Sequence, residues 1–227
     1  MSDPIILSDR RARTRDQLLA AAQSLLAERP AGALGVRQIT TAAGVPYSAF
    51  HSHYSSIEAM VEDLARLVFT SQTVLVERLR DSFAGPAEAF AAITRQTLRI
   101  VTDGPGYGQL LFDAGLPLDW FVAGMRQTLK ADITAAEQWG VFRIENIDIT
   151  VSLLAGAIAG AGLDLHRGVL DRSAIEPVTA RLLEFLGVGE RDAMRLAHAD
   201  ATFMPPPPLP LGWRDLAAIQ RDEWGVA

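Results

Sequence analysis

Hydrogen-bonding and aromatic side chains are concentrated between Tyr47 and His53, in the stretch YSAFHSH. Their hydroxyl and imidazole groups donate and accept hydrogen bonds. Small side chains such as Ala49 are suited to contact with a thymine methyl group. Carried on one short helix, groups of these kinds are suited to base edges and phosphates in the DNA major groove. The stretch therefore predicts a surface that contacts nucleic acid.

Patterns that would mark an active site are missing from the sequence. His51 and His53 lie two positions apart on the predicted helix, so their rings diverge and make a poor metal site. The stretch GPGYG at 104–108 follows a predicted helix rather than a strand, unlike a dinucleotide-binding loop. The chain has no cysteine, which excludes thiolate chemistry. We predict no catalytic residue, no metal and no cofactor, in a chain that is not an enzyme.

Short helices joined by a tight turn are expected to position the stretch from Tyr47 to His53. Apolar spacing predicts helices over 9–28, 36–43 and 46–53, followed by a long helix that starts after Ser55 or Ser56. Gly44 can adopt the left-handed conformation that ends a helix, and Pro46 suits a first turn. This arrangement is typical of a helix-turn-helix, although a helical hairpin inside a bundle gives the same pattern. The predicted DNA contacts are Arg37, Pro46, Tyr47, Ser48, Ala49, His51, Ser52 and His53.

The rest of the chain is also predicted to be helical, over 86–102, 108–114, 117–138, 146–168, 172–187 and 189–200. Period-two runs of β-branched residues with tight glycine turns are missing. The predicted fold class is all-α. We expect a three-helix head at 1–56, a larger helical body at 57–200 and a proline-rich tail at 201–227.

Net charge is −6 and is unevenly distributed. Residues 1–56 contain six arginines against four acidic residues, giving +2, so the remaining residues carry −8. The acidity therefore belongs to the body and does not forbid a phosphate partner for the head. Arg10, Arg11, Arg13 and Arg15 either touch phosphates or form a solvated face.

The chain is expected in the cytoplasm, without a membrane partner. Its N-terminal stretch MSDPIILSDRRARTRD lacks the order of a signal peptide, and the absence of cysteine suits a reducing compartment. Residues 147–165 are long and apolar, but Asp148 and Asp164 lie within them. We therefore interpret this segment as a buried helix of a soluble protein rather than a membrane span.

The predicted head resembles the TetR family of one-component transcriptional regulators. Residues 44–60, GVPYSAFHSHYSSIEAM, are similar to the family pattern G-V-S-x-G-T-L-Y-x-H-F-x-x-K-E-x-L, and VRQITTAAGV at 36–45 is similar to V-R-D-I-A-x-x-A-G-V. The resemblance covers about residues 12–64. Three positions depart from the pattern: His51 replaces a phosphate-contacting tyrosine, Ile57 replaces a lysine, and Gly35 stands where a capping threonine is common.

The resemblance implies a repressor that binds palindromic operator DNA as a homodimer and is released by a small, mainly apolar effector. It places effector binding and dimerisation in the body. The candidate effector contacts are Phe69, Tyr107, Phe112, Trp120, Met125 and Trp139. Small residues four apart on one helix, such as Gly156 and Gly160 with Ala159 beside them, let helices approach closely and are the candidate dimer interface, although packing within one chain fits the same pattern.

Two other interpretations stay open. The chain could be a ligand-binding or helical scaffold protein whose helix-turn-helix head no longer binds DNA, and His51 and Ile57 favour that alternative. The run PPPPLP at 205–210 fits either a semi-rigid spacer or a docking ligand. The apolar stripe after it, Leu211, Trp213, Leu216, Ile219 and Trp224, is expected to fold back on the body.

Overall fold

The structure is a computed structural model that describes residues 4–104, 106–116 and 118–220, without the side chains of residues 4–8, 118–121 and 219. Every regular element in these ranges is a helix, which confirms the predicted all-α fold. The chain divides into two compact units. Unit 1 contains residues 1–74, 109–118 and 207–227, and unit 2 contains residues 75–108 and 119–206.

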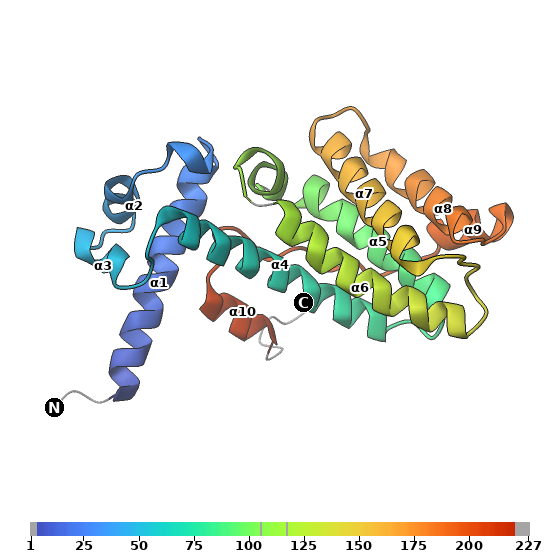
Figure 1. Ribbon diagram of the computed structural model, residues 1–227, viewed down its shortest axis with the longest axis horizontal. Coiled ribbons are helices and arrows are strands. Elements are labelled where there is room, and N and C mark those ends of the chain that lie inside the picture. Colours follow the sequence, from blue (N-terminus) through green and yellow to red (C-terminus); the bar gives the residue numbers. More distant parts are fainter. Residues whose placement is uncertain (1–3, 105, 117, 221–227) are drawn as a thin grey trace. The chain divides into compact units, whose positions relative to one another are not determined.

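Unit 1 is built around the head. It contains α1 (Pro4–Leu26), the 3-10 turn η1 (Ala31–Ala33), α2 (Val36–Ala42), α3 (Tyr47–His51), the first part of α4 (Ile57–Asp81), the π-helical turn η2 (Gln109–Asp113) and α10 (Trp213–Gln220). Figure 1 shows α2 and α3 beside α1. The core of this unit is formed by side chains that are fully buried: Leu18, Leu19, Leu26, Ile39, Phe50, Met60, Leu64 and Leu67. These side chains form the inward faces of α1, α2, α3 and α4.

The turn between α2 and α3 has the geometry predicted from Gly44. Gly44 has a φ of 65°, in the left-handed region that favours glycine. Its N–H donates to the Thr41 carbonyl at 3.2 Å, and the Val45 N–H donates to the Thr40 carbonyl at 3.0 Å. This pair of bonds is a Schellman C-cap, which satisfies the last carbonyls of α2. Pro46 precedes α3 with extended backbone at ψ 147°, rather than lying in its first turn as predicted.

Unit 2 is a helical bundle. It contains the rest of α4, α5 (Pro86–Asp103), α6 (Leu118–Gln138), α7 (Ile147–His166), the 3-10 turn η3 (Arg172–Ala174), α8 (Ile175–Phe185) and α9 (Glu190–Ala197). Helix α5 packs against α7, α8 and α9, and α8 lies beside α9 (Figure 1). The shared core includes Phe90 and Leu98 of α5, Leu154 of α7 and Leu183 of α8. Asn146 caps α7, because its side chain accepts the Ile149 N–H at 3.0 Å.

The two compact units are divided differently from the predicted segments 1–56, 57–200 and 201–227. The division falls inside α4, between Val74 and Leu75, because Met60 and Leu64 of this helix are buried in the core of unit 1. The tail stripe was expected to fold on the body at 57–200, whereas the structure places it against α1 of the head and also against Asp63 of the predicted body. Leu211 and Leu216 are buried within unit 1, and α10 contacts α1. The Ile219 side chain and Trp224 lie outside the described residues.

Helix α7 is the one described helix whose length and composition would allow it to cross a membrane, and 28% of its most apolar window is buried. Its exposed apolar side chains include Ile149 and Leu153. The helix is therefore less buried within one chain than the sequence interpretation expected. The exposed apolar side of α7 is therefore a candidate surface for contact with a partner.

Candidate nucleic-acid interface

The outward face of α3 carries the residues predicted to contact DNA. Tyr47 is 54% exposed, Ser48, His51 and Ser52 are also exposed, and Phe50 between them is buried in the head. Pro46 before the helix and Arg37 on α2 are exposed as well, whereas Ala49 and His53 are half-buried. One buried anchor with polar neighbours facing outward is the arrangement that a recognition helix requires.

Aromatic contacts orient the imidazole of His51. Its ring lies 5.4 Å from the Tyr47 ring and 5.4 Å from the Phe50 ring, both measured between centroids and both edge-to-face. Edge-to-face pairs add about 0.5–1.5 kcal/mol beyond the burial of their surface. Because Phe50 is fixed in the core, these contacts restrict the outward Tyr47 and His51 side chains as well.

A buried carboxylate, Asp63 of α4, joins the elements around α3. Arg15 of α1 donates from Nε at 2.9 Å and from Nη2 at 2.6 Å, and the Tyr54 hydroxyl donates at 2.7 Å. The Trp213 indole N–H of α10 donates to the same carboxylate at 3.4 Å. Asp63 is only 3% exposed, so these donors replace the water that it loses on burial.

Sequence reasoning missed Asp63, and it assigned Arg15 to phosphate contact or a solvated face. The structure shows instead that Arg15 forms a bidentate ion pair with Asp63. One signal for Asp63 was present, because an acidic residue stands within the apolar stripe formed by Met60 and Leu64. The identity of its partners needed the fold.

The same cluster shifts the pKa values of its neighbours. Burial and the hydrogen bond to Asp63 raise the pKa of Tyr54 well above its usual range. Burial alone would lower the pKa of Arg15, but its hydrogen bonds with Asp63 and Tyr54 outweigh that effect and raise it. Burial and the nearby charges of Arg11 and Arg15 lower the pKa of His53.

A hollow of about 610 Å³ lies beside the end of α3 and contains arginine side chains from two helices. Arg11 and Arg15 of α1 and Arg66 of α4 line it together with His53. Arg11 also donates to the Ser52 carbonyl at 3.3 Å, which ties α1 to the end of α3. Since Asp63 neutralises Arg15, the cations that face solvent are Arg11 and Arg66, and both are suited to a phosphate.

One of the positions that depart from the family pattern, Gly35, has a local replacement. At Gly35, where a capping side chain is missing, the backbone N–H donates to the Gln38 side-chain oxygen at 3.0 Å. At the start of α4, Ser56 accepts the Ala59 N–H at 3.2 Å and caps the helix, as predicted. Ile57, the first residue of α4, is half-buried and offers no charge to a phosphate.

The predicted effector contacts do not gather in one described cavity. Phe69 and Phe112 belong to unit 1, whereas Tyr107, Met125 and Trp139 belong to unit 2. Tyr107 is almost fully buried and Met125 is half-buried. Trp139 is 72% exposed and lines a cavity of about 210 Å³ with Phe90, Arg80 and Asp132. The Trp120 side chain lies outside the described residues.

The predicted dimer residues lie on the exposed side of α7. Gly156 and Gly160 are exposed and Ala159 is half-buried. A Cβ atom added at Gly156 or Gly160 would meet no other atom within 4 Å. Packing within the chain therefore does not explain these two glycines. Among the described residues, no group of three or more His, Cys, Asp or Glu side chains could hold a metal ion.

Taken together, the buried core, the Schellman turn and the exposed face of α3 define a helix-turn-helix DNA-binding head. Residues 18–64 match the family model described as "Bacterial regulatory proteins, tetR family". The head thus resembles the TetR family over residues 18–64, within the segment where the sequence resemblance lies. Members of this family are DNA-binding regulators rather than enzymes.

Comparisons of sequence and of structure with known proteins both support this resemblance. The chain is 39% identical over 89 residues to the HTH-type transcriptional repressor LfrR of Mycolicibacterium smegmatis, a match that spans 39% of this chain and 46% of that repressor. The chain thus spans about half the length of this curated relative. Among solved structures, RolR in complex with resorcinol is similar with a TM-score of 0.70 and 22% identity, over 86% of this chain and 98% of RolR. NalD, the secondary repressor of the MexAB-OprM multidrug efflux pump in Pseudomonas aeruginosa, is similar with a TM-score of 0.63 and 19% identity, over 76% of this chain and 95% of NalD. At these identities the two solved structures show a shared fold.

Proposed function

We propose that this chain is a cytoplasmic transcriptional repressor that binds a palindromic operator as a homodimer and is released by a small, mainly apolar effector. The observation that carries the proposal is the outward face of α3, where Tyr47, Ser48 and His51 are exposed above the buried Phe50. The head-level similarity to the repressor LfrR supports repression. We propose no membrane partner.

The DNA contacts follow from the geometry of the head. Ser48, Ala49 and Ser52 are short enough to let α3 approach the base edges, and Tyr47 and His51 can reach bases or phosphates. Pro46, His53 and Arg37 flank this surface, and Arg37 is suited to a backbone phosphate. With Ile57 in place of a lysine, we expect a weaker dependence of affinity on salt than a charged residue there would give.

The homodimer is supported by the exposed side of α7. Ile149 and Leu153 expose apolar side chains on the same helix as the open Gly156 and Gly160. On α8, Phe185 is 50% exposed. Apolar side chains beside glycines let two helices pack closely and bury surface that is costly to leave in water. A second copy of the chain would cover this surface and place two recognition helices on one operator.

The effector is proposed to bind in unit 2. The 210 Å³ cavity contains the aromatic rings of Phe83, Phe90 and Trp139, with an ion pair between Arg80 and Asp132 at 2.9 Å on its wall. Apolar walls with a few polar groups are typical of small-molecule sites. RolR, which has a similar fold, was solved with the small aromatic ligand resorcinol. An effector of that size and character fits this cavity, and Trp139 fluorescence would report its binding.

The test is fluorescence anisotropy of the purified protein with DNA from the region upstream of its own gene, titrated with salt and with scrambled competitor DNA. Saturable binding that outcompetes scrambled DNA and protects a palindrome is the expected result. Equal, weak binding to both DNAs would instead favour a ligand-binding or scaffold protein whose head does not read DNA.

Ile57→Lys separates a weakened head from one that does not read DNA. A lysine at the start of α4 adds one phosphate contact per subunit, so the salt dependence of operator binding should steepen by about 0.9 per subunit in log–log slope. An unchanged slope would mean that the start of α4 does not approach the DNA backbone.

A further inference from the structure

The C-terminal segment is built into the head by buried hydrogen bonds. Gln23 of α1, itself buried, donates from its amide nitrogen to the Leu211 carbonyl at 2.7 Å and accepts the Leu211 N–H at 2.9 Å. Leu211 and Leu216 are buried beside it. A glutamine that satisfies both backbone groups of one residue fixes that residue in place.

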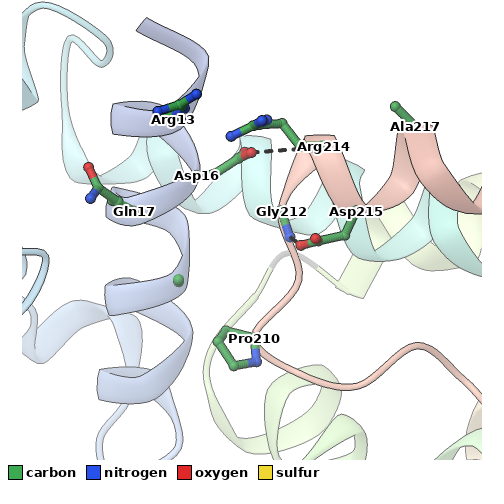
Figure 2. A pocket seen from close by; sticks show the side chains of 9 residues that line it. Arg13, Asp16, Gln17, Pro210, Gly212, Arg214, Asp215 and Ala217 are labelled. Carbon is green, nitrogen blue, oxygen red and sulfur yellow. Dashed lines mark hydrogen bonds between the residues drawn. The ribbon is translucent and has the colours of Figure 1, made fainter. Parts of the chain in front are cut away.

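A carboxylate of α1 caps the helix that follows. Asp16 accepts the Trp213 N–H at 2.9 Å and the Arg214 N–H at 3.3 Å, which are the first two N–H groups of α10. The Asp215 side chain accepts the Gly212 N–H at 2.7 Å (Figure 2). An anion at these N–H groups satisfies donors that the helix cannot satisfy itself and interacts favourably with its dipole.

The C-terminal segment lies very close to α1 at Gly212. A Cβ atom added at Gly212 would lie 2.8 Å from Cγ of Asp16 and 3.1 Å from its Cβ. Asp16 has little freedom to move, because both of its oxygens are engaged as the cap of α10. Figure 2 shows Gly212, Arg214 and Asp215 facing Asp16 and Arg13 across the groove between α1 and α10.

Trp213 connects this segment to the recognition helix. Its indole N–H donates to Asp63 at 3.4 Å, and the Arg15 guanidinium lies 5.2 Å from the centre of its ring. The same Asp63 accepts the hydroxyl of Tyr54, which lies three residues after the end of α3. Tyr54 also packs against Phe50 of α3, with ring centroids 5.7 Å apart.

Helix α3 depends on such contacts for its position. It has five residues, and an isolated helix of that length is unstable in water, so its tertiary contacts must hold it. The helix is held by the packing of the Phe50 ring against Tyr54 and by the hydrogen bond from Arg11 to the Ser52 carbonyl. Loss of the Trp213 donor would leave Asp63 with fewer hydrogen bonds in a buried site, and Arg15 and Tyr54 would lose a fixed partner.

We infer that residues 211–220 complete the DNA-binding head, and that Trp213 is a positioning residue for the recognition helix, acting through Asp63 and Tyr54. The inference rests on the proposed DNA-binding function and adds the C-terminal segment to it. Docking of this segment and operator binding are then coupled, and each strengthens the other by the same factor.

The test uses the full chain and two changes in the segment, each with a matched control. Trp213→Phe removes the N–H donor and keeps an aromatic ring, while Arg195→Gln removes a side-chain donor from an exposed hydrogen bond to Asp192 in unit 2. Gly212→Ala pushes a methyl group against Asp16, while Gly189→Ala adds a methyl group in open space before α9. Operator affinity is measured by anisotropy, and folding by circular dichroism.

Trp213→Phe and Gly212→Ala should each weaken operator affinity about three- to tenfold, the size expected for losing one typical hydrogen bond. The two controls should bind like the unchanged protein. Full operator affinity in both segment variants would overturn the inference.

A second measurement keeps the inference testable if the variants fold poorly. With Trp120, Trp139 and Trp224 replaced by phenylalanine, Trp213 is the single tryptophan and reports on docking through acrylamide quenching. Operator DNA should protect Trp213 from acrylamide more than scrambled DNA does, and equal quenching with both DNAs would contradict the coupling. If the unchanged protein does not distinguish operator from scrambled DNA, the proposed function fails, and the inference fails with it.

Discussion

Asp63 illustrates how one side chain can decide the geometry of a site that it does not enter. Its carboxylate is buried and accepts hydrogen bonds from α1, α10 and the segment after α3. A buried charge without partners costs several kcal/mol, so the three segments that supply the donors are held together by that requirement. The exposed recognition surface is therefore supported by an interior ion pair.

Asp63→Asn should lower the free energy of unfolding by about 3 kcal/mol, because it leaves the Arg15 guanidinium without its anion. Arg15 is partly exposed, which places the expected cost at the lower end of the range for buried pairs. Urea unfolding measures the change. Asp192→Asn, which breaks an exposed pair with Arg195 on α9, is the control and should cost at most about 0.5 kcal/mol.

His53 should make the head less stable in mild acid. Its pKa is lowered in the folded head by burial and by Arg11 and Arg15. The unfolded chain therefore takes up a proton near pH 6.5 that the folded head resists, so stability present above that pH is lost as the pH falls.

The loss should be smaller in His53→Gln, measured as the difference in melting temperature between pH 7.5 and pH 5.5. His198→Gln, which removes an exposed imidazole from unit 2, is the control. An equal difference in the His53→Gln variant and the unchanged protein would contradict the assignment to His53.

At the scale of elements, the turn between α2 and α3 sets the angle of the recognition helix. The turn requires one residue with positive φ, and Gly44 supplies it at the point where the two Schellman bonds close. No other residue type adopts this conformation as readily, so the direction of α3 depends on a single backbone position.

Gly44→Ala should lower the free energy of unfolding by about 1 kcal/mol, from backbone strain alone. A Cβ atom added at Gly44 would meet nothing within 4 Å, so no steric clash contributes. Gly32→Ala is the matched control, because its added Cβ is equally free and its φ is not positive. Equal stabilities of the two variants in thermal unfolding would show that the strain is absent.

At the scale of the whole molecule, the proline-rich stretch is held at both ends by buried glutamines. In unit 2, Gln96 donates to the Met204 carbonyl at 2.8 Å and accepts its N–H at 3.1 Å. In unit 1, Gln23 makes the same pair of bonds with Leu211. Residues 205–210 therefore lead from one anchored residue to another, which favours a spacer over a docking ligand.

The exposed side of α7 should govern assembly. Gly160→Leu adds a side chain where one chain by itself has open space, so the fold of the single chain should be unchanged. In a close-packed homodimer the same side chain would separate the helices. Light scattering after size exclusion should show a monomer for Gly160→Leu and a dimer for the control Ala131→Leu, which changes an exposed residue of α6. A dimeric Gly160→Leu variant would place the interface elsewhere.

Local rules account for what the sequence alone determined. The helices, the positive φ of Gly44, the Ser56 cap and the outward face of α3 follow from periodicity and from the conformations of single residues. These features depend on residues only a few positions apart, so one sequence suffices to predict them. The resemblance to the TetR family followed from the same short segment.

Only the tertiary structure decided what the buried polar groups pair with and where the tail lies. Asp63 and Trp213 are 150 positions apart, and Gln23 and Leu211 are 188 apart. An apolar stripe such as that of α10 shows that a surface must be covered, but many surfaces could cover it equally well. The position of the tail is set by specific hydrogen bonds to Asp16, Gln23 and Asp63. The sequence carries no local signal for partners so far away.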